Sequence, residues 1–183
     1  GTDQYGNPVT LAPNWSSDVG QVTNDTTGLT AHAVFTAQDT PAPDSGFVTA
    51  TQGTVQDFGI AHIRSGPLTT ITIKPSTTYL QVGATQTFIV TGTDASGNPT
   101  TTNPVWTAST GTIDQTGLFT APTAPTTGYV YASEGEVTGT AVVTVQPGPA
   151  NHSYVYPIAD QIAGQDFTLQ LEARDQYNNV ATG

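Results

Sequence analysis

The sequence predicts an all-β protein built from two-sheet antiparallel sandwiches, and its composition is the first reason. Thr supplies 36 of the 183 residues, whereas Leu supplies 7, and Met and Cys are absent. Thr and Val suit a pleated, half-buried surface, and the strong helix formers Leu, Lys, Glu and Arg are scarce. The 19 Gly and 13 Pro residues mark frequent turns. We therefore expect many short strands and no substantial helix.

An internal repeat is the second reason. Residues 1–15 (GTDQYGNPVTLAPNW) match residues 92–106 (GTDASGNPTTTNPVW), and residues 46–63 match residues 128–145. A period of about 80–90 residues is the length of one domain rather than of a short solenoid unit. The chain is therefore expected to consist of similar domains in series.

The phase of the repeat divides the chain into three parts. Residues 67–94 also match residues 149–175, so a complete repeat runs over residues 67–147. Residues 1–66 are then the back of one repeat, which lacks its first strands, and residues 148–183 are the front strands of a further repeat. We interpret the sequence as a processed chain or an excised segment.

Strand signals are clear within the complete repeat, because apolar alternation is punctuated by turn residues. The expected strands cover residues 69–75, 85–94, 105–109, 111–121, 127–135 and 137–147. This number of short strands in one repeat indicates a sandwich of two antiparallel sheets. Trp106 stands where we expect an anchor of the core, and Trp15 takes the same place in the first part of the chain.

One short phrase recurs near the start, in the middle and at the end of the chain. It reads DQYGNP at residues 3–8, DASGNP at residues 94–99 and DQYNNV at residues 175–180. Gly tolerates positive φ, Asp and Asn bond to nearby backbone, and Pro blocks continuation of a strand. We interpret the phrase as the turn after the second strand of each repeat.

This pattern resembles the bacterial immunoglobulin-like (Big) domains of surface proteins, adhesins and cell-wall enzymes. The resemblance rests on the D-x-x-G-N-P turn, on WTASTGTIDQTGLFTA at residues 106–121, and on the closing strands GYVYAS and AVVTV. It implies tandem immunoglobulin-like β-sandwiches, one complete and with incomplete units at both ends, in an extracellular or cell-surface location. It implies no single function, since such domains serve as spacers, stalks and binding tips alike.

The charge balance excludes two classes of partner. The chain has 14 acidic and 3 basic residues, and its net charge is −11. Nucleic acids and anionic membranes need a basic face, which Lys74, Arg64 and Arg174 cannot form. No apolar run approaches the length of about 20 residues that spans a bilayer. We expect neither nucleic-acid binding nor membrane insertion.

The sequence offers little for catalysis. His32, His62 and His152 lie in different parts of the chain, and no Ser or Cys stands in a nucleophile motif beside them. Glu134 and Glu136 flank a Gly, where a solvated turn explains them better than a carboxylate pair for glycoside hydrolysis. We expect a protein that is not an enzyme and has no cofactor.

Calcium is the alternative to that expectation. Asp3, Asp94 and Asp175 recur in turns that also carry Asn, and calcium takes hard oxygen ligands. Asp39, Asp44 and Asp57 would add ligands if the loops that carry them folded over. Turn chemistry alone explains the same residues, so we favour no metal and keep a calcium site as the competing interpretation.

Surface modification and sugar binding are two further hypotheses. Asn14, Asn24 and Asn151 each begin an N-x-S/T glycosylation sequon. Tyr129 and Tyr131 share one face of an expected strand and could contact a carbohydrate, although ordinary sheet packing explains them as well. Tyr5 and Tyr177 in the turns raise the same question.

The incomplete ends predict a partner. A sandwich that lacks its first strands exposes an apolar core and an unpaired edge. Residues 153–159 and 165–175 are strands of the type that the first part lacks. Their assembly residues are Tyr154, Tyr156, Phe167, Leu169 and Leu171. We expect the tail of one chain to complete the head of another by β-strand addition, as in donor-strand complementation, giving a head-to-tail homopolymer.

Three function classes follow from this expectation. The favoured one is a structural subunit or repeat segment of an extracellular surface fibre, filament or layer, which is either assembled by strand complementation or continued covalently with adjacent immunoglobulin-like domains in a tandem array. The phrase stands at residues 3–8 and again at residues 175–180, whereas a domain split in two needs this turn only once, so strand complementation requires that one copy of the turn be displaced or lie in a linker. The other classes are an adhesin stalk for cell adhesion and an accessory module of a secreted polysaccharide-degrading enzyme.

Overall fold

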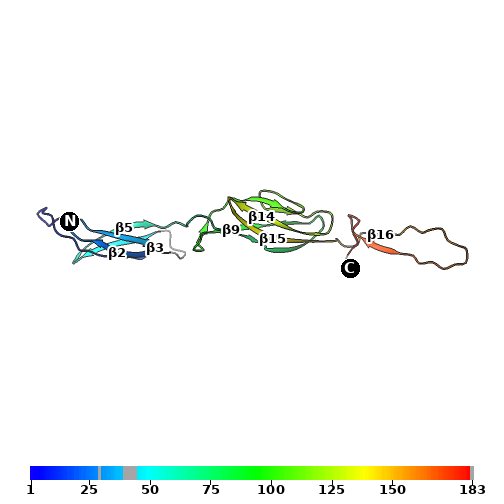
Figure 1. The fold of residues 1–183 in the computed structure, drawn as a ribbon, viewed down its shortest axis with the longest axis horizontal. Coiled ribbons are helices and arrows are strands. Elements are labelled where there is room, and N and C mark those ends of the chain that lie inside the picture. The colour runs from blue at the N-terminus through cyan, green and yellow to red at the C-terminus, as the bar shows by residue number, and fades with distance from the viewer. Residues whose placement is uncertain (29, 39–44, 182–183) are drawn as a thin grey trace. The chain divides into compact units, whose positions relative to one another are not determined.

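The computed structural model describes residues 1–28, 30–38 and 45–181. These residues form strands, turns and loops and contain no α-helix, which confirms the all-β prediction. None of them belongs to a helix long and apolar enough to cross a membrane. The chain divides into two compact units: residues 1–67 with 93–100, and residues 68–92 with 101–183 (Figure 1).

The complete repeat, residues 67–147, forms a sandwich of short antiparallel strands. Its strands are β6 (Thr70–Lys74), β7 (Thr77–Gln81), β8 (Thr85–Thr87), β9 (Ile89–Thr93), β10 (Pro99–Thr100), β11 (Val105–Ala108), β12 (Thr112–Ile113), β13 (Leu118–Thr120), β14 (Thr126–Glu134) and β15 (Val137–Gln146). One sheet has the order β11-β14-β15-β7, in which β7 joins β15 in parallel. The facing strands form the orders β12-β13-β8 and β10-β9-β6.

The core of this repeat lies between its sheets. Alternate residues of β14 and β15 point inward and are buried, as expected for strands with one solvated face. Phe88 and Phe119 meet edge-to-face with ring centroids 6.2 Å apart. The buried members of the cluster are Ile71, Ile73, Val82, Phe88, Trp106, Phe119, Ala121, Val130, Ala132, Ala141, Val143 and Val145. This cluster makes the complete repeat an immunoglobulin-like sandwich with its own core.

The first segment, residues 1–66, reproduces only the back of that sandwich. Its strands are β1 (Asn14–Ser17), β2 (Gly20–Thr26), β3 (His32–Ala37), β4 (Ser45–Gln52) and β5 (Val55–His62). They form the orders β1-β4-β5 and β2-β3. Trp15 faces Ala50 across β1 and β4, just as Trp106 faces Ala132 across β11 and β14. The first segment therefore follows the register of the complete repeat.

The tail, residues 148–183, contains β16 (His152–Val155) and β17 (Leu171–Arg174), which pair with each other in antiparallel fashion. Arg174 stacks on the Tyr154 ring at 3.9 Å and forms a 3.0 Å ion pair with Glu172. Strands were expected over residues 153–159 and 165–175, but residues 156–170 form an open loop (Figure 1). Among the described residues, no strand pairs with this loop to hold it extended.

Candidate functional site: the aspartate turn and the open sheet edges

The turn at Asp94 is held by its own carboxylate. Oδ1 accepts the backbone N–H groups of Ser96 and Asn98 at 3.0 and 2.8 Å, and Oδ2 accepts Asn98 Nδ2 at 3.0 Å. A further donor comes from outside the turn, because the N–H of Gly66 reaches Oδ2 at 2.7 Å. Gly66 directly precedes Pro67, where the complete repeat begins. The turn thus binds the backbone at the boundary of two repeats.

The turn at Asp175 has the same construction. Its carboxylate accepts the N–H groups of Tyr177 and Asn179, the Asn179 side chain, and the N–H of Gly148 at 2.9 Å. Gly148 precedes Pro149, which is the equivalent of Pro67. Asn179 Nδ2 also donates to the carbonyl of Thr123 at 2.8 Å, which ties the turn to the complete repeat.

The electrostatics of the Asp175 site follow from its burial and its donors. The side chain is fully buried, and burial by itself raises the pKa of a carboxyl group. The hydrogen bonds from Asn179, Gly148 and Tyr177 outweigh that effect and lower the pKa of Asp175 to about 2. The same kind of bonding, first of all from the Asn98 side chain, lowers the pKa of Asp94. Both carboxylates are therefore ionised and occupied by N–H donors.

The turn at Asp3 makes only the internal bonds. Its carboxylate accepts the N–H groups of Tyr5 and Asn7 at 2.8 and 2.9 Å and both contacts of the Asn7 side chain. These bonds, first that of the Asn7 side chain, lower the pKa of Asp3. Asp3 itself is exposed, whereas Asp94 and Asp175 are 6% and 0% exposed. Among the described residues, no backbone N–H of the Gly66 type reaches it.

Two sheet edges of the first segment are open. In the complete repeat, the outer edge of β15 pairs with β7, and the outer edge of β13 pairs with β8. Their equivalents in the first segment are β5 and β3, and each is the last strand of its sheet within the described part of the chain. The two strands that would cover these edges are the equivalents of β7 and β8. Unpaired edges of this kind are templates for strand addition.

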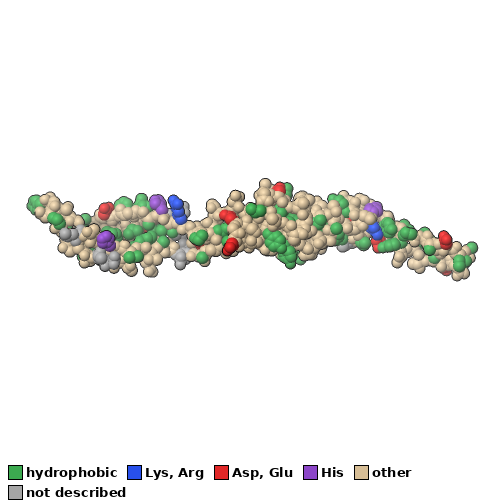
Figure 2. Space-filling model, turned by 45° about the horizontal axis from the view of Figure 1, so that its top comes forward, with side chains coloured by type: hydrophobic (Ala, Val, Ile, Leu, Met, Phe, Trp, Pro, Cys, Tyr) green, Lys and Arg blue, Asp and Glu red, His purple; other side chains and the backbone are tan. Residues whose placement is uncertain are grey.

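The inner face beside these edges is poorly covered. Phe119 of β13 is 0% exposed, but its equivalent Phe35 on β3 is only partly buried. Ala141 of β15 is 1% exposed, whereas a Cβ placed on the equivalent Gly59 would meet no atom within 4 Å. Hydrophobic side chains also reach the surface of this unit, where they appear green in Figure 2. The core of the first segment is therefore incomplete on the side of the strands equivalent to β7 and β8.

The tail exposes the residues that were expected to assemble. Tyr154 lies on β16 and is partly buried, and Leu171 begins β17 with 64% exposure. Tyr156, Phe167 and Leu169 lie in the loop rather than on strands, with exposures of 37, 49 and 60%. Tyr156 donates its hydroxyl hydrogen to Glu172, which raises the pKa of Tyr156. Phe167, Leu169 and Leu171 alternate along the chain and have no core to enter.

The other sites expected from the sequence lie apart from these features. Trp106 is 6% exposed, whereas Trp15 is only partly buried, since among the described residues the facing layer of its sheet consists of β2 and β3 alone. The sequon residues Asn14, Asn24 and Asn151 are all exposed, the first two on β1 and β2. Glycosylation at these positions stays a prediction.

The described residues contain no group of three or more His, Cys, Asp or Glu side chains that could hold a metal ion. Asp3, Asp94 and Asp175 lie in separate turns, and Asp57 uses its carboxylate to accept the N–H of Phe58 at 2.8 Å. Asp39 and Asp44 lie outside the described residues. The turn carboxylates direct their oxygen atoms at N–H donors, which is the opposite of an arrangement prepared for a cation.

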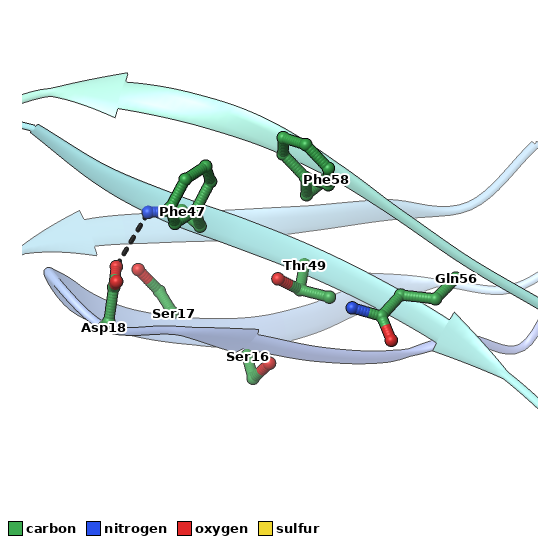
Figure 3. Close-up of a pocket in the computed structure, with 7 residues that line it drawn as sticks. All are labelled: Ser16, Ser17, Asp18, Phe47, Thr49, Gln56 and Phe58. Atoms are coloured by element: carbon green, nitrogen blue, oxygen red, sulfur yellow. Dashed lines mark hydrogen bonds between the residues drawn. The ribbon is translucent and has the colours of Figure 1, made fainter.

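A groove of about 500 Å³ lies on the outer face of the β1-β4-β5 sheet (Figure 3). Phe47 and Phe58 stand at one side of it, with ring centroids 5.1 Å apart in an edge-to-face arrangement. Asp18 Oδ1 is occupied by the N–H of Phe47 at 2.7 Å, the bond drawn in Figure 3. In the complete repeat, Tyr129 is the equivalent of Phe47, and its ring centroid lies 6.1 Å from that of Tyr131. Carbohydrate binding at these aromatic pairs stays a prediction.

Sequence reasoning missed the donors that complete the aspartate turns. No role was predicted for the backbone N–H groups of Gly66 and Gly148, although both residues stand in a Gly-Pro dipeptide at the start of a repeat. It also missed a clamp from the end of β14: Glu134 accepts the N–H of Asn103 at 2.7 Å. Gln52 at the end of β4 accepts the N–H of Ala12 at 2.8 Å in the same way. Gly66 and Gly148 recur at the domain period, whereas Gln52 and Glu134 occupy equivalent positions with different side chains.

No protein-family model matches this sequence, and no curated protein matches it. Among solved structures, the S-layer protein rSbsC(31-844) is similar over 99% of this chain and 26% of its own, with 21% identity and a TM-score of 0.43. InvD of Yersinia pseudotuberculosis is similar over 98% of this chain and 64% of its own, with 16% identity and a TM-score of 0.45. The N-terminal four Ig domains of Dscam1 isoform 1.9 are similar over 74% and 38%, with 12% identity and a TM-score of 0.36.

This chain therefore spans about a quarter of the length of the S-layer protein that it matches. At these identities, the three likenesses concern the fold and assign no function to the chain. What its residues do is argued below from their own contacts.

Proposed function

We propose that this chain is a structural segment of an extracellular surface fibre or layer, in which immunoglobulin-like units follow one another head to tail. The observation that carries the proposal is the repeated aspartate turn. Twice it binds the Gly-Pro backbone at which its own repeat begins, through Gly66 and through Gly148. A bond repeated at successive domain boundaries is expected in an array of domains in series, in which each repeat contacts only its neighbours.

Two further features support a structural role. The described residues hold no metal-type cluster, and His32, His62 and His152 lie on three different strands, β3, β5 and β16. The acidic, Thr-rich composition suits a surface outside the cell, and the missing strands of the first segment call for a neighbour of the same fold. These strands come either from another copy of the chain, by strand complementation, or from a further domain of a longer chain.

Electron microscopy of the purified 183-residue chain tests this proposal. We expect filaments or sheets at high protein concentration, together with a concentration-dependent increase in mass by light scattering. Deletion of residues 153–183 should abolish this assembly and leave the thermal transition of the complete repeat in place. A chain that stays monomeric at all concentrations, with its first segment fully protected from proteolysis, would contradict assembly between copies.

A further inference from the structure

The complete repeat shows which strands belong at the two open edges. In it, β8 pairs with β13 so that Leu118 faces Thr87 and Phe119 faces Gln86. The strand β7 runs parallel to β15, with Val142 facing Thr77. The same chain therefore contains a filled example of each edge that is empty in the first segment.

The tail carries the missing strands in the right order. Pro157 corresponds to Pro75, and Gly164 corresponds to Gly83, both glycines with positive φ (81° and 74°). Between them lie residues 158–163, which correspond to β7. After Gly164 the correspondence continues without a gap to Asp175, so residues 166–168 correspond to β8 and Leu169 to the buried Phe88.

From this correspondence we infer that the tail loop of a second copy of this chain fills both open edges of the first segment. Residues 166–168 pair antiparallel with β3, and residues 159–163 lie parallel beside β5. The inference deepens the proposed function, on which it rests, by naming the partner and its register. The contact is heterologous, so each copy offers a tail and receives one.

The predicted register places each residue type where it is needed. Val34 of β3 faces Thr168, and Phe35 faces Phe167, as Phe119 faces Gln86 in the complete repeat. Leu169 and Leu171, now exposed, enter the half-formed core beside Phe35. Burial of these side chains on both partners supplies the driving force for docking.

One pair of residues favours the tail over another copy of the complete repeat as the occupant. Gly139 of β15 packs closely against Ile71, since a Cβ at Gly139 would be only 2.7 Å from the Ile71 carbonyl oxygen. The first segment has the exposed Asp57 in place of Gly139, and the tail has Ser153 in place of Ile71. An isoleucine would bury the Asp57 carboxylate with only the N–H of Phe58 as its donor, whereas a serine hydroxyl can supply a second hydrogen bond.

Cysteine cross-linking tests the register, because this 183-residue sequence contains no cysteine. A Val34→Cys chain is mixed with a Thr168→Cys chain of different mass and mildly oxidised. Paired residues in adjacent strands lie within disulfide distance, so the mixed dimer should form about tenfold faster than with the control Ala33→Cys, whose side chain points to the opposite face. Equal rates for the two pairs in a chain that still assembles would overturn the register and leave the proposed function standing.

Two other outcomes also decide the question. If a single chain with both Val34→Cys and Thr168→Cys forms only an intrachain disulfide at a concentration-independent rate, the occupant is the chain's own tail, and the second copy is excluded. If no variant cross-links and no assembly is seen, both this inference and copy-to-copy assembly fail.

A variant pair without cysteine provides a second measurement. Leu169→Asp should abolish assembly, because it places a charge at the core position of Phe88, while Thr168→Asp on the outer face should assemble. Leu169 is 60% exposed in the single chain, so neither change should move the thermal transition of the complete repeat. Assembly of Leu169→Asp at the unsubstituted level would overturn the inference.

Discussion

At the scale of single residues, the aspartate of the repeated turn is the most informative side chain. Four N–H donors converge on Asp175, and one of them, Gly148, belongs to the backbone where the repeat that contains Asp175 begins. The carboxylate of Asp175 therefore has two roles: it stabilises its own turn, and it holds the backbone at the start of the tail. Asp3 forms the same turn, but among the described residues its carboxylate accepts hydrogen bonds only from within that turn.

This arrangement predicts how the tail responds to acid. The pKa of Asp175 is about 2 in the folded chain, below its ordinary value of 3.8. The ionised carboxylate therefore stabilises the folded tail fully above pH 3.8, and this contribution is lost as the pH falls towards 2. The amide chemical shift of Gly148, followed by NMR, should titrate with a midpoint near the lower value.

The control for this titration is the Asp175→Asn chain, in which the Gly148 amide should show no such midpoint. Protection of that amide from hydrogen exchange should also fall in the variant at neutral pH, because the buried acceptor has lost its charge. A midpoint at or above 3.8 in the unsubstituted chain would contradict the role assigned to Asp175.

At the scale of elements, equivalent strands differ in how much of their apolar surface they bury. Phe119 on β13 lies between two sheets and is fully buried, while Phe35 on β3 lies at the same register position beside an open edge. The difference comes from β8, which pairs with β13 and has no counterpart on β3 within the described residues.

This comparison predicts unequal costs for the same substitution. Phe119→Ala should lower the free energy of unfolding of the complete repeat by about 3–5 kcal/mol, the usual cost of removing a buried aromatic ring. Phe35→Ala should cost clearly less in the dispersed chain, because Phe35 is only partly buried. Denaturant unfolding measures both free-energy changes, from the separate transitions of the complete repeat and of the first segment.

The assembled state provides the control for this pair. If a tail strand covers β3, Phe35 becomes a core residue, and the cost of Phe35→Ala should approach that of Phe119→Ala under assembling conditions. Costs for Phe35→Ala that are equal in the dispersed and the assembled chain would argue against strand addition at this edge.

At the scale of the whole molecule, net charge governs association. The chain has a net charge of −11 with only 3 basic residues, so two copies repel each other at long range. Apolar strand addition has to overcome this repulsion. Assembly should therefore depend on ionic strength even though no ion pair between copies is required.

We predict that the protein concentration needed for assembly falls as NaCl is raised from about 10 to about 150 mM, since the screening length shortens over this range. Light scattering measures the onset. Calcium chloride at matched ionic strength should act no more strongly than magnesium chloride, because the turn carboxylates are occupied by N–H donors. A specific effect of calcium would instead support a metal site at Asp3, Asp94 or Asp175.

The sequence by itself determined the all-β fold, the period of the repeat and the turn at each aspartate, because these depend on local propensity and on spacing along the chain. It also pointed to Trp106 as a core residue, since its place after the turn fixes which face of β11 it occupies. Such features are encoded by residues that are close in sequence.

Only the tertiary structure decided which backbone groups complete the turns and which edges stay open. The hydrogen bond from Gly66 to Asp94 joins residues 28 positions apart. A Gly-Pro dipeptide does not by itself indicate that its N–H group donates to a distant carboxylate. Residues 156–159 and 165–170 were predicted as strand, yet they form a loop. A strand needs a neighbour for its backbone hydrogen bonds, and that neighbour is a property of the fold and the assembly rather than of the segment.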